Sequence, residues 1–99
     1  MPFTRISVAQ AKELIAEKDP QIVDVRDQPS YQNGHMDNAV LVSDANVQEF
    51  IQQADWDRPL IVCCYHGNMS QSAADFFSNN GFEEVYSLDG GYAAWSAAQ

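Results

Sequence analysis

The segment that decides the fold is L-I-V-C-C-Y-H-G-N-M-S, residues 60–70. Three large apolar residues lead into two cysteines, a polar loop with one glycine follows, and a helical pattern begins at Ser70. An apolar run without alternation is typical of a parallel strand that is covered on both faces. The segment therefore predicts a buried central strand over residues 60–64, a short loop wrapped around its last cysteine, and a helix that points at that cysteine.

Cys64 opens this loop, and the loop suits a nucleophile. Loop N–H groups and the positive end of a helix dipole both favour negative charge at one point, so a thiol there ionises more readily than a free thiol. Gly67 and Asn68 tolerate the backbone angles that turn N–H groups inward. The alternative is a buried structural cysteine, which is the common fate of a free cysteine. We favour the nucleophile for Cys64 and the structural role for Cys63.

The other loop residues allow more than one role. His66 could be a general base, a loop charge or an exposed polar residue at the loop tip. Tyr65 and Met69 flank the cysteine and are expected to form an apolar rim around its sulfur, although they could simply pack beside it. Ser70 is predicted to cap the helix, and its hydroxyl could also donate to an anion on the sulfur.

Asp24 and Arg26 stand at the end of another expected strand, residues 22–25. An exposed ion pair of this kind would contribute little to stability. Because the ends of neighbouring parallel strands converge, the pair could instead support the cysteine loop. We expect a supporting role and no direct part in catalysis.

Composition limits the partners of the chain. Fourteen acidic residues against five basic ones give a formal charge of −9, and the basic residues are scattered, so nucleic acid is not an expected partner. A small anionic substrate would be repelled at long range and must be captured by local N–H donors. The first residues lack the pattern of a secretory leader, and no apolar run approaches a membrane span. The sequence thus predicts no membrane association and a cytoplasmic location.

The two cysteines are adjacent and do not resemble the disulfide framework of a small secreted domain. No C-x-x-C or H-x-x-x-H spacing occurs, and His35 and His66 lie far apart in the sequence, so no metal site is expected.

The whole chain of 99 residues is expected to form one domain, because that length supports one core. Further strands are predicted at residues 22–25, 39–42 and 84–87. Helices are predicted to begin at Ser7 with Gln10 at the capping-box position, at Ser43 or Asp44, and at Ser70, with a helical turn at residues 29–32 and a last helix over residues 92–98. Trp56 is expected to lie against the core. This alternation predicts an α/β fold with a mostly parallel central sheet of about five strands and helices on both faces, with the ligand beyond the carboxyl ends of the strands.

Three segments of the chain resemble the signatures of the rhodanese domain. They are I-V-D-V-R-D-x-x-x-Y-x-x-G-H-M at residues 22–36, C-Y-H-G-N-M-S at residues 64–70 with two alanines behind it, and D-G-G-Y-A-A-W at residues 89–95. The match spans nearly the whole chain in the right order. Loop and length are most similar to the small single-domain bacterial thiosulfate sulfurtransferases of that family.

By this resemblance Cys64 is the catalytic residue of a thiosulfate sulfurtransferase. It takes the outer sulfur of thiosulfate or a similar small anionic donor, forms a persulfide, and passes the sulfur to cyanide or to a thiol acceptor, such as a small redox protein. The N–H groups of residues 65–70 (Tyr65, His66, Gly67, Asn68, Met69 and Ser70) would bind the substrate and stabilise the anion. No metal or organic cofactor is implied.

The chain departs from the family pattern at two positions. Met69 occupies a loop position that often carries Arg, Lys, Ser or Thr in relatives, and methionine offers thiosulfate neither a charge nor a strong donor. Asn38 stands where the family usually has glycine, and asparagine can still adopt a left-handed turn there.

Two other classes of function were considered. A rhodanese-like phosphatase has a loop one residue longer that is closed by an arginine, whereas here Ser70 stands six residues after Cys64 and the loop contains no arginine. A partner-fed sulfur relay, or a non-catalytic rhodanese-like binding module, agrees with the acidic surface. Low activity with thiosulfate together with ready persulfide formation from a protein donor would favour the relay.

Overall fold

The computed structural model describes residues 3–99 of the chain. Along these residues strands alternate with helices in the order β1 (Thr4–Ile6), α1 (Val8–Lys18), β2 (Gln21–Asp24), α2 (Gln28–Asn33), β3 (Val40–Leu41), α3 (Val47–Gln53), β4 (Leu60–Cys63), α4 (Met69–Asn79), β5 (Val85–Leu88) and α5 (Gly91–Ala97). The expected domain and the expected lack of a leader also involve residues 1 and 2, which lie outside the described residues.

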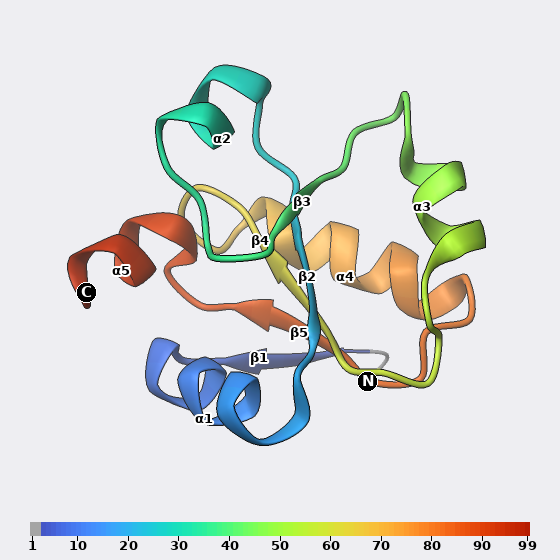
Figure 1. The fold of residues 1–99 in the computed structure, drawn as a ribbon, viewed down its shortest axis with the longest axis horizontal. Coiled ribbons are helices and arrows are strands. Elements are labelled where there is room, and N and C mark those ends of the chain that lie inside the picture. Colours follow the sequence, from blue (N-terminus) through green and yellow to red (C-terminus); the bar gives the residue numbers. More distant parts are fainter. Residues whose placement is uncertain (1–2) are drawn as a thin grey trace.

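The five strands form one sheet in the order β1-β5-β4-β2-β3, and each neighbouring pair is parallel. In the centre, Val62 of β4 pairs with Val23 on one side and Ser87 on the other. Figure 1 shows α1 and α5 on one side of the sheet, α3 and α4 on the other, and α2 beyond the carboxyl end of β2. The predicted α/β architecture, with a parallel sheet and helices on both faces, is confirmed.

All four residues of β4 are buried, which explains why its sequence is apolar without alternation. Leu60 and Val62 join the core on the side of α3 and α4, whereas Ile61 and Cys63 join the core on the side of α1 and α5. Neighbouring side chains of a strand point to opposite faces of the sheet, so a strand in the middle of two helical layers needs apolar residues at every position.

Strand β1 is an element that the sequence pattern did not predict. It has three residues, of which only Ile6 is buried, and it lies at the sheet edge, where it pairs with β5. A three-residue edge strand with two exposed polar positions is too short to show a periodic pattern. The predicted helix that follows is confirmed, because the Ser7 hydroxyl accepts from the Gln10 N–H at 3.1 Å and the Gln10 side chain accepts from the Ser7 N–H at 2.8 Å.

The predicted start of α3 was wrong. The helix begins at Val47, and its N-cap is Asn46 rather than Ser43 or Asp44. The Asn46 side chain does not cap the helix, because its amide donates to the Leu41 carbonyl at 2.9 Å and its oxygen accepts from the Ser43 N–H at 2.7 Å. The asparagine is therefore used to fix the turn that leads from β3 to α3.

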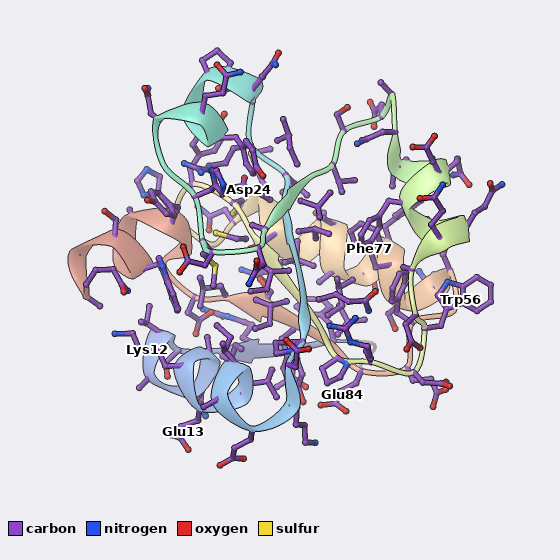
Figure 2. The ribbon with its side chains drawn as sticks, viewed as in Figure 1. Lys12, Glu13, Asp24, Trp56, Phe77 and Glu84 are labelled. Carbon is purple, nitrogen blue, oxygen red and sulfur yellow. The ribbon has the colours of Figure 1, made fainter. Side chains whose placement is uncertain are left out.

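Trp56 was expected to lie against the core, but it is not among the side chains that pack on either core cluster. Its side chain is 47% exposed and lies at the margin of the molecule in Figure 2. The indole N–H donates to the Ile51 carbonyl at 2.8 Å, and one edge of the ring faces Gly81. The left-handed turn expected at Asn38 is present, with φ +69°.

Candidate active site

Cys64 directly follows β4 and is 1% exposed. Its Sγ atom accepts hydrogen bonds from the backbone N–H groups of Gly67 at 3.2 Å and Ser70 at 3.1 Å. Successive N–H groups aimed at one point form an anion-binding concavity. The loop of residues 64–70 therefore places its donors where a negatively charged sulfur is stabilised.

The loop is held in this shape by the first residues of α5. The Tyr92 N–H donates to the Cys64 carbonyl at 2.8 Å, and the Ala93 N–H donates to the Tyr65 carbonyl at 3.1 Å. Because the carbonyls at the start of the loop point toward α5, the later N–H groups are free to point at the sulfur. The amino end of α5 is thus part of the site's framework.

Two glycines allow this close approach. Gly91 has φ +58°, and a Cβ atom there would lie 2.5 Å from the Cys64 carbonyl oxygen. Gly67 has φ +94°, and a Cβ atom there would lie 2.7 Å from the backbone nitrogen of Gly90. From the sequence, residues 89–95 were singled out only as one of three segments that resemble a family signature, whereas the structure shows Gly91 packed against the backbone of the cysteine loop.

The prediction that Ser70 caps the helix was wrong. Helix α4 begins at Met69, and Asn68 occupies the N-cap position without a side-chain cap bond. The Ser70 hydroxyl instead bonds the Ser87 hydroxyl of β5 at 2.7 Å, and both residues are fully buried. This contact leaves the Ser70 N–H as the group that faces the sulfur. Ser87 was not singled out from the sequence, although a serine inside an apolar strand is a signal that a polar partner is near.

The flanks of the loop differ in exposure. Met69 is 52% exposed and Tyr65 is partly buried, so both lie at the rim of the site. The Tyr65 hydroxyl donates to the carboxylate of Asp27, and this bond is the main cause that lowers the pKa of Asp27 to about 2. His66 is exposed, and within residues 3–99 no hydrogen bond joins its ring to Cys64. This exposure agrees with an exposed polar residue at the loop tip, one of the three roles considered for His66.

Asp24 and Arg26 form a buried pair. The Arg26 guanidinium donates to both carboxylate oxygens of Asp24, with Nη2 to Oδ2 at 2.7 Å, and this bond raises the pKa of Arg26. The same Nη2 atom donates to the Gly34 carbonyl at 2.7 Å, and the guanidinium lies 4.4 Å from the centre of the Tyr92 ring. Figure 2 shows Asp24 toward the carboxyl end of β2, below α2.

The pair is therefore not the exposed ion pair that was one of the two alternatives considered from the sequence. It joins the end of β2 to the residue after α2 and to Tyr92 of α5, whose N–H holds the Cys64 carbonyl. A buried ion pair needs such additional hydrogen bonds, because each charge loses its hydration on burial. This arrangement agrees with a supporting role for Asp24 and Arg26.

Cys63 is fully buried against the core on the side of α1 and α5. Its thiol donates to the Cys64 carbonyl at 3.6 Å. Burial, followed by the negative charge of Asp24, raises the pKa of Cys63 to about 12. Cys63 therefore remains a protonated thiol near neutral pH, as a structural cysteine does.

Within residues 3–99, no three His, Cys, Asp or Glu side chains gather as the ligands of a metal ion would. None of the helices in the same range combines the length and apolar character that crossing a membrane requires.

The fold and the loop define a class of protein: a parallel α/β domain with a cysteine at the carboxyl end of its central strand and backbone donors directed at its sulfur. The sequence model of the family described as "Rhodanese-like domain" matches residues 7–98. The chain belongs to this family, as its resemblance predicted.

Two curated relatives are both named "Thiosulfate sulfurtransferase GlpE". The protein of Shewanella oneidensis is 50% identical over 96 residues, which cover 97% of this chain and 95% of the relative. The protein of Pseudoalteromonas translucida is 47% identical over 98 residues, which cover 99% of this chain and 93% of the relative. Among solved structures, a rhodanese-like domain protein from Staphylococcus aureus superimposes with a TM-score of 0.81 at 26% identity and covers 94% of this chain and 91% of its own.

Proposed function

We propose that this chain is a thiosulfate sulfurtransferase that carries sulfane sulfur as a persulfide on Cys64. The observation that carries the proposal is the pair of backbone N–H groups, from Gly67 and Ser70, that donate to Cys64 Sγ. Two curated proteins that share 47% and 50% of their residues with this chain, over nearly their whole length, are named for the same activity, which supports the proposal.

In the first half-reaction the Cys64 thiolate attacks the outer sulfur of thiosulfate. The sulfur–sulfur bond of thiosulfate breaks, sulfite leaves with the electron pair of that bond, and the enzyme retains Cys64–S–S⁻. No oxidant is required, because the charge of the thiolate and thiosulfate equals that of the persulfide and sulfite. Splitting one sulfur transfer into two nucleophilic steps is the general benefit of a covalent intermediate.

In the second half-reaction an acceptor attacks the outer sulfur of the persulfide. Cyanide takes the outer sulfur and becomes thiocyanate, whereas a thiol takes it and becomes a persulfide that keeps the thiol proton. In both cases Cys64 is released as a thiolate. The negative charge remains near the same loop in the free thiolate and in the persulfide, so donors fixed by the fold stabilise both states without rearranging.

The remaining site residues have assigned roles within this proposal. The backbone of residues 65–70 binds the anion, and Gly67 and Ser70 supply the donors that already reach the sulfur. Asp24 and Arg26 hold α5 and the residue after α2 in place around the loop. Since the chain has a net charge of −9, capture of thiosulfate depends on these short-range donors.

We also propose that the reaction takes place in the cytoplasm with a thiol as the acceptor. The two cysteines are both free, and a persulfide and a thiol acceptor persist in a reducing compartment.

The test is intact-mass measurement of the protein after incubation with thiosulfate and again after addition of cyanide. We expect the wild type to gain the mass of one sulfur atom and to lose it to cyanide, while Cys64→Ser gains nothing. A wild type that gains no sulfur from thiosulfate would overturn the proposal, and gain from a protein persulfide alone would support the relay.

A further inference from the structure

An apolar groove of about 610 Å³ lies beside the cysteine loop, between the amino ends of α3 and α4. In Figure 1 the segment that joins β3 to α3 arches away from α4, and this segment forms one wall of the groove. The apolar lining comes from both walls and from the residue after β2, and consists of Val25, Val42, Val47, Met69, Ala73, Phe76 and Phe77. None of these residues has a role in the proposed chemistry except Met69.

The groove borders the loop around Cys64, because Met69 belongs to both. Met69 directly precedes Ser70, whose N–H donates to Cys64 Sγ at 3.1 Å. Val25, at the other side of the groove, donates its N–H to the Cys63 carbonyl at 2.9 Å. An occupant of the groove therefore lies next to the loop that surrounds Cys64, with Met69 shared between the two.

The groove is exposed and apolar. Four large apolar side chains of residues 3–99 are exposed, and two of them, Met69 at 52% and Phe76 at 39%, line this groove. Exposed apolar side chains that gather in a concave surface mark a binding site more often than single exposed residues do. Methionine in particular adapts its shape to different partners.

The charges around the groove exclude an anion as its natural occupant. The lining contains no lysine or arginine, and its single charged residue is Asp44. The whole chain carries nine net negative charges. Thiosulfate and cyanide have nothing to gain from such a surface, whereas an apolar segment with neutral or basic flanks gains both apolar contact and charge attraction.

We propose that this groove receives the acceptor, and that the acceptor is a cysteine-bearing peptide segment of a protein, with apolar residues beside its cysteine and neutral or basic flanks. This inference rests on the proposed function and names the acceptor class for the second half-reaction. The groove lies to one side of the sulfur. An acceptor that fills the groove must therefore carry a thiol at the sulfur and apolar side chains beside that thiol, as a peptide segment does. A small thiol would leave the groove empty.

The transfer step balances without another reagent. The acceptor thiol attacks the outer sulfur of the Cys64 persulfide, the bond between Cys64 Sγ and that outer sulfur breaks, and Cys64 leaves as a thiolate. The acceptor becomes a persulfide, and the proton of its thiol remains with the product. The apolar groove contributes only by positioning the attacking sulfur.

The test uses protein loaded with sulfur by thiosulfate, freed of excess donor, and mixed with one of two synthetic peptides. Each peptide has one cysteine, flanked in the first by leucine, phenylalanine and lysine and in the second by serine and glutamate. Sulfur loss from Cys64 is followed by mass. Each rate is divided by the rate at which the same peptide reduces a small disulfide, which corrects for the reactivity of its thiol.

We expect the corrected rate of the apolar basic peptide to exceed that of the acidic peptide by about tenfold, which corresponds to partial burial of one or two apolar side chains. Phe76→Ser should lower the rate of the apolar peptide several-fold and leave loading by thiosulfate unchanged. Val40→Ser is the matched control, because Val40 is 45% exposed but does not line this groove. In a second variant, Ser72→Arg, an exposed residue of the lining gains a positive charge and should raise the rate of the acidic peptide.

Equal corrected rates for the two peptides, or equal losses in Phe76→Ser and Val40→Ser, would overturn the inference. If Phe76→Ser fails to fold, the two peptides and Ser72→Arg still decide it. Failure of thiosulfate to load the wild type would overturn the proposed function instead. In that case, inorganic polysulfide supplies the sulfur, and the groove is tested with the same peptides.

Discussion

The two adjacent cysteines occupy opposite environments although both are hidden from solvent. Cys63 is 0% exposed and Cys64 is 1% exposed. The Cys63 thiol acts as a donor, to the Cys64 carbonyl, whereas the Cys64 sulfur acts as an acceptor, from two backbone N–H groups. A buried sulfur is thus kept neutral on one side of a peptide bond and prepared for negative charge on the other. Because both sulfurs are buried, the difference between them lies in the groups around them: Asp24 and an accepting carbonyl near Cys63, and two donating N–H groups at Cys64.

The difference arises where the strand ends. Cys63 is the last residue of β4, and its side chain points into the core between the sheet and the layer of α1 and α5. Cys64 is the first residue beyond the strand, and its own carbonyl is held by the Tyr92 N–H of α5. Its side chain therefore points toward the loop that follows. One step along the chain changes both the direction of the side chain and the groups that meet it.

The largest expected effect separates the two cysteines directly. Cys64→Ser should lower thiosulfate sulfurtransferase activity by a factor of roughly 10³ or more, since loss of a covalent nucleophile removes the reaction path. Cys63→Ala should retain most of the activity, because Cys63 has no contact with the reacting sulfur. Steady-state assays with thiosulfate and cyanide measure both. Equal losses in the two variants would mean that the comparison assigns the chemistry to the wrong thiol.

The next effect concerns the turn that holds the loop. Gly91→Ala adds a Cβ atom 2.5 Å from the Cys64 carbonyl oxygen, at a residue with φ +58°. Displacement of the donors by about 1 Å should cost roughly a hundredfold in activity. The backbone strain should also cost about 1–3 kcal/mol of unfolding free energy. Activity and denaturant unfolding are measured on the same preparation.

Gly81→Ala is the matched control for this variant. Gly81 also has a positive φ, +110°, but a Cβ atom there would meet the Trp56 ring at 3.4 Å and not the loop. This variant should lose stability and retain activity. If both glycine variants lost activity in proportion to stability, the contact between α5 and the loop would have no special role in shaping the site.

Much of this arrangement follows from local sequence. The apolar run of β4 predicts a central strand, and Ser7 with Gln10 predicts the start of α1, because a strand between two layers and a capping box each depend on a few neighbouring residues. Cys64 can likewise be selected over Cys63 from the glycine and asparagine that follow it. These features are confirmed as structure, while the catalytic role of Cys64 stays a proposal.

The parts that the sequence did not predict depend on contacts between distant residues. The pairing of the Ser70 and Ser87 hydroxyls, which overturned the predicted cap, joins residues 17 positions apart. The approach of Gly91 to Cys64 requires β5 to lie beside β4. Strand β1 is stabilised as a strand by pairing with β5, since its own three residues show no pattern. In each case, the sheet order decides what the local sequence leaves open.

A smaller effect tests the Cys63 side of the comparison. Its pKa is raised from an ordinary value near 9 to about 12, so between these pH values the unfolded chain releases a proton that the folded chain retains. Stability is therefore unaffected below pH 9 and falls as pH rises toward 12, by at most about 1.4 kcal/mol per pH unit. The unfolding free energy should therefore fall less between pH 8 and pH values above 9 in Cys63→Ala than in the wild type.

Denaturant unfolding of wild type and Cys63→Ala at several pH values measures this difference. Tyr86, whose pKa is also raised to about 12 by burial and by its bond to Glu84, is present in both proteins and cancels in the comparison. Identical pH dependence in the two proteins would mean that the Cys63 thiol titrates in the folded state as it does in the unfolded chain.

The smallest expected effect lies at the outer edge of the Cys64 side, where Tyr65 ties the loop to the first residue before α2. The Tyr65 hydroxyl donates to Asp27 and is the main cause that lowers the pKa of that carboxyl to about 2; the N–H and hydroxyl of Ser30 contribute less. Tyr65→Phe should therefore raise the pKa of Asp27 toward its ordinary value of 3.8 without restoring it fully. Carboxyl carbon chemical shifts followed by NMR between pH 2 and 6 report this pKa directly.

Because Asp27 is exposed, the change in stability should be slight, and activity should fall only if this tether also positions the donors at Cys64. A strong loss of activity without a shift in the Asp27 pKa would show that Tyr65 acts on the sulfur side of the loop and not through Asp27.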